Sequence, residues 1–234
     1  MTGTLWGLGV GPGDPELVTL KALRILRAAP VVAYLAPEAG RSFARGIVAS
    51  ELDPARIEIA IAVPMERARH PAQAVYDLAA REIAGHLGAG RDVAFLCQGD
   101  PFFYGSFIQI FERLGSTYPT RIVPGITSLT ACAAAARLPL ASRETTLTAI
   151  PATLPEPLLE QHLQQAEAVA ILKLGRNFAK ARQVLERLGR AEHAIYVEHA
   201  SLASERVLGL AEVDPVAVPY FSMILVPAAE ETRR

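Results

Sequence analysis

Over the first half of the chain, short apolar runs alternate with amphipathic segments. The clearest run, residues 93–97, holds no charged position, which is typical of a strand covered on both faces of a sheet. Similar runs predict four more strands, at 4–9, 31–35, 57–63 and 121–123. Helical spacing is clearest in the apolar set Phe107, Ile110, Phe111 and Leu114, with Gly115 as the stop.

Three further helices are predicted between these strands. Asp14-Pro15 combines a good N-cap with a residue suited to the first helical position, so a helix is expected to begin there. Ser42 can cap a second helix that extends to residue 48, and a third covers 75–83. Strands alternating with helices imply parallel βαβ units in a doubly wound sheet. Five such strands complete a domain of ordinary size, which we place at residues 1–124.

The pattern changes after Pro124-Gly125. An alanine-rich helix is predicted at 127–137, and a helix with Phe178, Ala181 and Leu185 on one face ends near Gly189. Residues 151–157 are bracketed by prolines, and no element is predicted there. Strands are expected at 144–150, 168–174, 194–198, 206–210 and 220–226. Because the last strands have little helix between them, the pattern predicts a second α/β domain, residues 125–234, with a mixed sheet.

Composition restricts the class of protein. The chain of 234 residues is 51% apolar and carries a net charge of −1, so it is expected to fold. The chain has no surplus of basic residues, and a nucleic-acid partner is therefore not expected. The uncharged run 122–136, whose length no other run exceeds, is short and contains proline and glycine, so no membrane segment is expected. A secretory signal is not expected either. Two cysteines, Cys97 and Cys132, cannot form a disulfide framework. These features favour a soluble, cytoplasmic enzyme.

A glycine cluster, residues 7–13, follows the first predicted strand. The dinucleotide fingerprint needs Gly-x-Gly-x-x-Gly, yet the sixth position is Pro12 counted from Gly7 and Asp14 counted from Gly9. No Gly-Lys-Ser/Thr occurs, which excludes a nucleotide P-loop. The cluster therefore predicts either a tight turn alone or a loop whose backbone closely approaches some other ligand.

Two more clusters follow later strands. Residues 97–105 (CQGDPFFYG) come after the buried fourth strand, and 123–128 (VPGITS) come after the fifth. Three aromatic residues after Asp100 could stack on a planar ligand or belong to the core. Thr127 or Ser128 could contact a ligand or only cap the next helix. In open α/β sheets ligands bind at the carboxyl ends of the strands, and all three clusters lie at that edge, which favours a shared site.

Together these segments resemble the tetrapyrrole methylase family: 9–22 (GVGPGDPELVTLKA), 99–101 (GDP) and 124–128 (PGITS) match in order and spacing. In the second half, 172–177 (LKLGRN), 196–198 (YVE) and 219–222 (PYFS) resemble one branch of that family, the precorrin-2 C(20)-methyltransferases. The resemblance covers nearly the whole chain. It departs at His199, where the branch has arginine, and in the short segment 205–219.

This resemblance implies a homodimer with S-adenosylmethionine held in a cleft between the two domains and released as S-adenosylhomocysteine. It implies methylation of the C(20) meso carbon of precorrin-2, giving precorrin-3A in cobalamin biosynthesis. Cofactor contacts are then carried over to the matching positions. They are Val10, Pro12, Gly99, Asp100, Phe103, Thr127, Ser128, Leu172, Leu174, Tyr196 and Ser222.

The implied chemistry asks little of acids and bases. Methyl transfer requires the donor and acceptor atoms in line at about 3–3.5 Å, so orientation and exclusion of water dominate. The meso proton could pass to Asp100, to Glu198 or to solvent. The five histidines are scattered, and no metal site is predicted. Because the substrate carries eight carboxylates, we expect guanidinium groups around it, with Arg41, Arg45, Arg143 and Arg176 as candidates.

Two alternatives remain open. The same methylation could act on cobalt-factor II, the cobalt-loaded substrate of the anaerobic route, since a metal within the substrate leaves no ligand requirement on the protein. A non-catalytic tetrapyrrole-binding protein could keep the fold without binding S-adenosylmethionine. The intact segments 9–15 and 99–101 argue against that second alternative.

Overall fold

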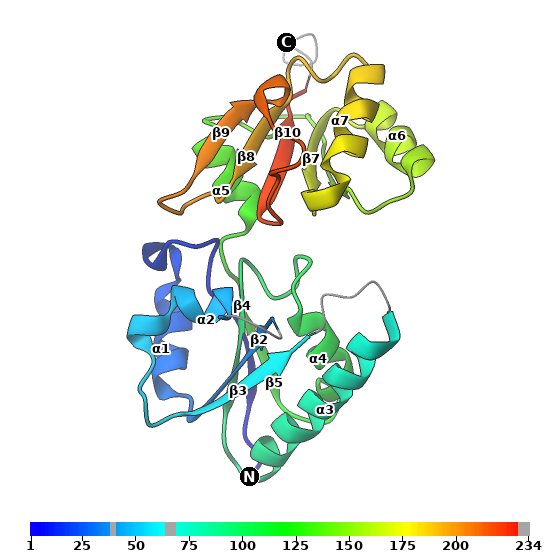
Figure 1. Cartoon of the computed structure of the whole chain (residues 1–234). Coiled ribbons are helices and arrows are strands. Elements are labelled where there is room, and N and C mark those ends of the chain that lie inside the picture. Colours follow the sequence, from blue (N-terminus) through cyan, green and yellow to red (C-terminus); the bar gives the residue numbers. More distant parts are fainter. Residues whose placement is uncertain (38–40, 64–68, 229–234) are drawn as a thin grey trace. The chain divides into compact units, whose positions relative to one another are not determined.

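The chain divides into two compact units, Met1–Thr127 and Ser128–Arg234, shown in Figure 1. The structure, a computed structural model, describes residues 1–37, 41–63 and 69–228. The division falls three residues after the boundary that we placed at 124/125. Each unit is an α/β domain around its own sheet, which confirms the predicted fold class.

The first unit contains a five-stranded sheet in the order β3-β2-β4-β1-β5, with every neighbouring pair parallel. Each of the five strands overlaps its predicted range. Their bounds are β1 Leu5–Gly9, β2 Val31–Ala36, β3 Ile57–Ala62, β4 Val93–Cys97 and β5 Thr120–Val123. The helices are α1 Leu20–Ala28, α2 Phe43–Ile47, α3 Arg69–Gly88 and α4 Phe107–Leu114, with short 3-10 turns at Pro15–Leu17 and Ala49–Glu51.

Side chains alternate between the two faces of this sheet, and helices cover both faces (Figure 1). Leu5, Phe95 and Cys97 point toward α3 and α4, where Ile83, Phe107 and Ile110 complete one apolar cluster. Leu8, Ala94 and Leu96 point toward α1 and α2 and form a second cluster. The helix that follows β1 therefore lies on one face, and the helix that follows β4 lies on the other.

The first helix begins later than predicted. Asp14 Oδ1 accepts the Glu16 N–H at 2.9 Å, but the turn that it caps is only the 3-10 segment Pro15–Leu17. Thr19 is the true N-cap of α1, since its hydroxyl accepts the Ala22 N–H at 3.2 Å. The Asp-Pro signal was therefore a real cap, but of a single turn.

The second unit contains a five-stranded sheet that is mixed, as predicted, with the strand order β6-β7-β10-β8-β9. Only β6 and β7 are parallel; β10 runs antiparallel to β7 and β8, and β9 to β8. The strands are β6 Leu147–Pro151, β7 Ala168–Leu172, β8 Ile195–Glu198, β9 Arg206–Gly209 and β10 Ser222–Val226. The helices are α5 Ser128–Ala135, α6 Glu156–Gln165 and α7 Phe178–Arg187, with 3-10 turns at Gly175–Asn177 and Leu210–Glu212.

Helix α6 is not predicted by the sequence pattern, and β6 begins three residues after its predicted start. Helix α6 contains a proline, Pro157, in its first turn, where a missing N–H costs nothing. Only Leu159 and Leu163 of this helix are buried, so its apolar stripe is narrow. The α6–α7 side of the sheet holds the larger apolar cluster, and α5 packs against the opposite side through Ala131 and Cys132. Within the described residues, no helix has the length and apolar character needed to cross a bilayer.

Candidate active site

Three parallel strands bring the predicted loops of the first unit to one edge. Gly9, the last residue of β1, pairs with Cys97, the last residue of β4. On its other side, β1 aligns Leu8 with Val123, the last residue of β5. Because the helices after β1 and β4 cover opposite faces, this edge is the position at which open α/β sheets bind ligands.

The first two loops are joined through their main chains. Gly99 donates its N–H to the Gly11 carbonyl at 2.7 Å, and the reverse hydrogen bond measures 3.4 Å. Both residues have positive φ, 79° at Gly11 and 68° at Gly99, a conformation that glycine adopts without steric cost. Val10 adds a hydrogen bond from its N–H to the Cys97 carbonyl at 2.9 Å. The two loops therefore form one hydrogen-bonded unit.

The third loop packs directly on the other two. A Cβ atom added to Gly125 would lie 2.0 Å from the Gly99 carbonyl oxygen and 2.8 Å from the Gly9 Cα. A Cβ added to Gly9 would lie 2.5 Å from the Gly125 Cα. The glycines at these positions are thus required by backbone contact among the three loops.

Asp100 ties the second loop to the third. Its Oδ1 accepts the N–H groups of Phe102 and Phe103 at 2.8 and 3.1 Å, and its Oδ2 accepts the Gly125 N–H at 3.0 Å. Gln98, which the sequence analysis did not single out, donates from Nε2 to the Pro12 carbonyl at 3.4 Å and links the second loop to the first.

The aromatic residues after Asp100 divide into two groups. The Phe102 ring packs edge-on against Phe111 of α4, with centroids 5.1 Å apart. Phe103 packs edge-on against Tyr104 instead, also at 5.1 Å, and is only half-buried. Phe102 thus extends the aromatic packing of α4, whereas Phe103 is the member left for the candidate site.

Val10 and Pro12 of the first loop can present mainly main-chain atoms to a ligand. The Val10 side chain is buried in the apolar cluster beneath α1 and α2, and Pro12 is buried as well. Thr127 is the last residue of the first unit, and Ser128 begins α5.

The second-unit candidates also gather at one sheet edge. Met223 of β10 pairs with Leu172, the last residue of β7, and Ser222 pairs with Glu198, the last residue of β8. Ser222 is buried and donates its hydroxyl hydrogen to the Pro219 carbonyl at 2.6 Å. Just before β10, Tyr220 and Phe221 form an edge-to-face pair at 5.4 Å.

The chain turns sharply at this edge. Lys173 follows β7 with φ of 59°, and His199 follows β8 with φ of 52°. Non-glycine residues rarely adopt this conformation, and such strain gathers at functional sites. Leu174, next to Lys173, is buried in the apolar cluster on the α6–α7 side.

Tyr196 and Glu198 differ from the expectation that they face a ligand. The Tyr196 ring is fully buried, packs edge-on against Phe178 at 5.6 Å, and donates from its hydroxyl to Glu198 at 2.5 Å. Burial and the Glu198 hydrogen bond raise the Tyr196 pKa. Glu198 is itself buried and forms an ion pair with Arg206 at 3.0 Å. Tyr196 can therefore offer a ligand only its main chain, and Glu198 is engaged within the unit.

Comparison with known protein families agrees with the meeting of the three loops at one edge of the first sheet. The family model described as Tetrapyrrole (Corrin/Porphyrin) Methylases matches residues 4–214. The chain belongs to the tetrapyrrole methylases. This finding confirms the resemblance drawn from the loop motifs.

Individual tetrapyrrole methylase relatives span most of the chain. Cobalamin biosynthesis protein CobIJ of Mycobacterium tuberculosis is 45% identical over 96% of this chain, which covers 46% of that protein. The chain therefore spans about half the length of the CobIJ relatives it matches. Precorrin-2 C(20)-methyltransferase of a Sinorhizobium species is 40% identical over 96% of this chain and 95% of its own length. Cobalt-precorrin-2 C(20)-methyltransferase of Salmonella typhimurium is 34% identical over 97% of both chains.

A solved structure shares the fold. Uroporphyrin-III C-methyl transferase from Thermus thermophilus, complexed with S-adenyl homocysteine, has a TM-score of 0.69 and 27% identity, with 99% of each chain covered.

One of the four candidate arginines of this tetrapyrrole methylase is already paired. Arg45 donates from Nε and Nη2 to the two carboxylate oxygens of Glu58, at 2.8 and 2.9 Å. Tyr34 donates to the same carboxylate at 2.6 Å. The Arg45 hydrogen bonds lower the Glu58 pKa, and Glu58 in turn raises that of Arg45. Glu58 thus occupies the Nε and Nη2 donors of Arg45, and a role of Arg45 in binding the substrate stays a prediction.

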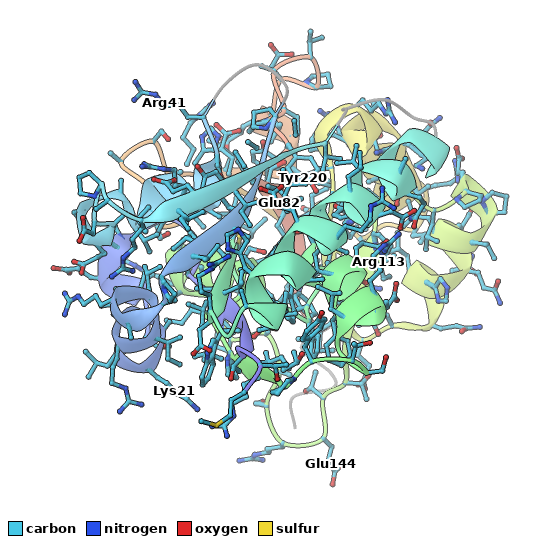
Figure 2. All side chains as sticks on the ribbon, turned by 90° about the horizontal axis from the view of Figure 1, so that it is seen from below. Lys21, Arg41, Glu82, Arg113, Glu144 and Tyr220 are labelled. Atoms are coloured by element: carbon cyan, nitrogen blue, oxygen red, sulfur yellow. The ribbon has the colours of Figure 1, made fainter. Side chains whose placement is uncertain are left out.

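The other three arginines are exposed. Arg41 extends away from the ribbon (Figure 2). Arg143 lies in the loop before β6 with φ of 50°, and Arg176 lies in the 3-10 turn that follows β7. Among the residues that the structure describes, no three His, Cys, Asp or Glu side chains are grouped so as to hold a metal ion.

Arg206 is the polar partner that the sequence analysis missed. It lies directly opposite Glu198 in the β8–β9 pair. Opposite charges at facing positions of an antiparallel pair stabilise each other. The two strands were predicted, so the signal was available once their register was known.

Proposed function

We propose that this chain is an S-adenosylmethionine-dependent methyltransferase that methylates C(20) of precorrin-2, giving precorrin-3A in cobalamin biosynthesis. The observation that carries the proposal is the 40% identity with a precorrin-2 C(20)-methyltransferase along nearly the whole of both chains. Convergence of the three family loops at one edge of the first sheet supports it.

The residues at the carboxyl edge of the first sheet fit the proposed cofactor. S-adenosylmethionine bears a nucleoside and an amino-acid group, which main-chain N–H and C=O groups and an aromatic ring can recognise. In the three glycine loops, main chain packs directly against main chain at this edge. When bound, the cofactor supplies an activated methyl group and leaves as S-adenosylhomocysteine.

In the first unit, Val10, Pro12, Gly99, Phe103 and Thr127 would hold this cofactor, together with Asp100. In the second unit, the proposed contacts are Ser128, Leu172, Leu174 and Ser222, with Tyr196 acting through its main chain. A relative whose solved structure contains S-adenyl homocysteine has the same fold at 27% identity, which supports this assignment.

The chain's own residues would act mainly by orientation. Carbon methylation gains most from holding the reacting atoms in line, so rigid loops serve it better than mobile acids or bases. Both candidate proton acceptors already have partners: Asp100 accepts three main-chain N–H groups, and Glu198 is held by Tyr196 and Arg206. Solvent is therefore the proposed acceptor of the meso proton.

The proposed substrate carries eight carboxylates, and Arg41, Arg143 and Arg176 are the candidates left to bind them. Arginine can bind a carboxylate through two parallel hydrogen bonds, which gives each contact both strength and direction. Their exposure leaves the guanidinium groups accessible to such a ligand.

The cobalt-containing substrate is the second candidate. The 34% identity with the Salmonella enzyme is lower than the 40% identity with the Sinorhizobium enzyme, which favours the metal-free substrate. The test is an anaerobic assay with precorrin-2 and cobalt-factor II in parallel, following methyl transfer by mass. Faster turnover of cobalt-factor II would overturn the choice of precorrin-2.

A non-catalytic tetrapyrrole-binding protein is separated from the enzyme by cofactor binding. Isothermal titration with S-adenosylhomocysteine should give saturable binding near one molecule per chain. Binding of tetrapyrrole without any binding of S-adenosylhomocysteine would favour the non-catalytic protein and reject the methyltransferase.

The assembly and location are part of the same proposal. The enzyme is a homodimer in the cytoplasm, with a small tetrapyrrole as its partner and neither a nucleic acid nor a membrane. The net charge of −1 supports the absence of a nucleic-acid partner. Analytical ultracentrifugation should give about 50 kDa, twice the 25.1 kDa of one chain.

A further inference from the structure

The Asp100 carboxylate is directed at the main chain of two different loops. Its Oδ1 is used within its own loop and its Oδ2 by Gly125, 25 residues later. We infer that Asp100 is a positioning residue for the proposed methyl transfer, which holds the second and third loops in the shape that binds the cofactor. This inference rests on the proposed function and gives Asp100 a role other than proton acceptor.

One carboxylate oxygen of Asp100, Oδ1, fixes the shape of the second loop, which carries Phe102 and Phe103. By accepting from Phe102 and Phe103 together, Oδ1 closes a tight turn of the kind that aspartate forms with the residues just after it. The chain then continues through Tyr104 at φ of 55°. A Cβ on Gly105 would lie 2.4 Å from the Pro101 carbonyl oxygen, so the loop folds back on itself. This turn holds Phe102 against α4 and leaves Phe103 with Tyr104.

The other carboxylate oxygen, Oδ2, fixes the third loop at its closest contact with the first two loops. Gly125 lies in main-chain contact with Gly9 and Gly99, so its peptide group must hold one orientation. A peptide N–H that loses its partner in a half-buried site carries a desolvation cost. Asp100 Oδ2 satisfies that N–H. The same hydrogen bond connects the third loop to the pair already joined through Gly11 and Gly99.

These contacts require a side chain that only accepts hydrogen bonds. A carboxylate presents two acceptor oxygens, whereas an amide presents one oxygen and one NH2 group. In Asp100→Asn the NH2 group must face either the Gly125 N–H or the N–H groups of Phe102 and Phe103. Two donors then face each other, so one of these contacts becomes repulsive. Asp100→Ser keeps one short acceptor for its own loop and cannot reach Gly125.

The experiment measures S-adenosylhomocysteine binding by calorimetry for the wild type, Asp100→Asn and Asp100→Ser. We expect the dissociation constant to rise about tenfold or more in both variants, since each loses a charge-assisted hydrogen bond. The pH profile of kcat should keep its shape in both variants, because no proton acceptor is removed. Amide exchange at Gly125 should be faster in Asp100→Ser.

Asp92→Asn is the matched control. Asp92 accepts the Thr4 N–H at 2.7 Å and the Trp6 indole N–H at 3.2 Å, at the opposite end of β1 and β4. The Asp92→Asn substitution should lower the thermal unfolding temperature and leave the affinity for S-adenosylhomocysteine unchanged. The comparison separates an effect on loop position from an effect on general stability.

The outcomes are distinct. Absence of binding to the wild type rejects the proposed function itself. Wild-type binding with unchanged affinity in both Asp100 variants rejects the positioning role while the function stands. A large loss of kcat at unchanged affinity, with a lost limb of the pH profile, would make Asp100 the proton acceptor and also overturn the inference. If Asp100→Asn does not fold, Asp100→Ser and the Gly125 exchange rate decide.

Discussion

Gly9 and Gly125 lie against each other so closely that neither position has room for a Cβ atom. The nearest atoms to the missing Cβ of Gly125 are the Gly99 carbonyl oxygen at 2.0 Å and the Gly9 Cα at 2.8 Å. These atoms belong to main chain at the ends of adjacent strands, so they cannot move aside as a flexible side chain would. The carboxyl edge of the first sheet is therefore built on contact between peptide groups.

Gly125→Ala should consequently separate the third loop from the other two. We expect it to destabilise the first unit by about 1–3 kcal/mol, the usual cost of overpacking, and to weaken S-adenosylhomocysteine binding more than tenfold. Chemical denaturation and calorimetry measure the two effects. Gly85→Ala is the control, since its Cβ would meet nothing within 4 Å inside α3. That change should stabilise the protein by about 0.5–1 kcal/mol. Equal effects of the two substitutions would contradict the close-contact account.

The Arg45–Glu58 pair should affect stability and its pH dependence, but not substrate binding. Arg45 lowers the folded-state Glu58 pKa below its unfolded value, so the pair stabilises the fold above the unfolded pKa of about 4.3. This stabilisation is lost as the pH falls through the folded-state pKa. Because both side chains are partly exposed, Glu58→Gln should cost at most about 1 kcal/mol at pH 7.

Urea unfolding of wild type and Glu58→Gln at pH 7 and near pH 3 tests this expectation. The difference between the two proteins should narrow at the lower pH. A difference that widens on acidification, or an Arg45→Ala variant with unaltered stability and weakened tetrapyrrole binding, would show that the ion pair is not its main role.

Two exposed arginines should differ in their effect because their partners differ in burial. Arg206 pairs with Glu198, whose side chain is 8% exposed, whereas Arg187 pairs with Glu156 and Glu160 on the surface. Arg206→Ala leaves a buried carboxylate with the Tyr196 hydroxyl and no cation, so it should cost about 1–3 kcal/mol. Arg187→Ala should cost less than Arg206→Ala, because the Arg187 ion pairs lie in solvent. Denaturation midpoints of the two variants measure the difference. A greater loss of stability in Arg187→Ala than in Arg206→Ala would contradict the role given to burial of Glu198.

Both cysteines should be unreactive in the folded protein. Burial raises the pKa of Cys97 and of Cys132 to about 12, so almost no thiolate is present near pH 8. Ellman's reagent should label neither cysteine before unfolding and both in strong denaturant. Rapid labelling of either residue under native conditions would contradict the described packing.

Arg143 and Arg176 should contribute to tetrapyrrole binding if they hold its carboxylates. Replacing either with alanine should weaken tetrapyrrole affinity about tenfold, the loss of one charge-assisted contact, and leave S-adenosylhomocysteine affinity unchanged. Fluorescence titration with the tetrapyrrole measures the effect. Arg182→Ala, which removes an arginine paired with Glu186 along α7, is the control. Unchanged affinity in both variants and in Arg41→Ala would remove these arginines from the substrate site.

The elements predicted best from the sequence are those whose burial is uniform. All five residues of β4 are buried, so the run 93–97 reads as a strand without reference to any neighbour. Helix α6 failed because only Leu159 and Leu163 enter the core, and its remaining positions resemble a loop. Strand β6 was placed too early because only one of its five residues is fully buried, which leaves its start unmarked in the pattern.

The candidate site could be predicted where it depends on strand ends and not where it depends on side-chain direction. Gly9, Gly99 and Gly125 meet because parallel strands end at one edge, a rule that topology alone supplies. Tyr196 is different: the two-residue alternation of β8 turns its ring, with Glu198, toward Phe178 and α7. Likewise Arg45 could not be assigned to Glu58 from sequence, since that contact depends on how α2 packs on β2 and β3.

The place of β1 between β4 and β5 in the first sheet has a consequence for how the protein is made. Its two neighbours are β4 and β5, so a nascent chain holds residues 5–9 without a partner strand until residues 93–97 have been synthesised. At ordinary ribosomal speeds that delay is on the order of ten seconds. During this delay the unpaired apolar strand β1 is exposed both to chaperones and to aggregation.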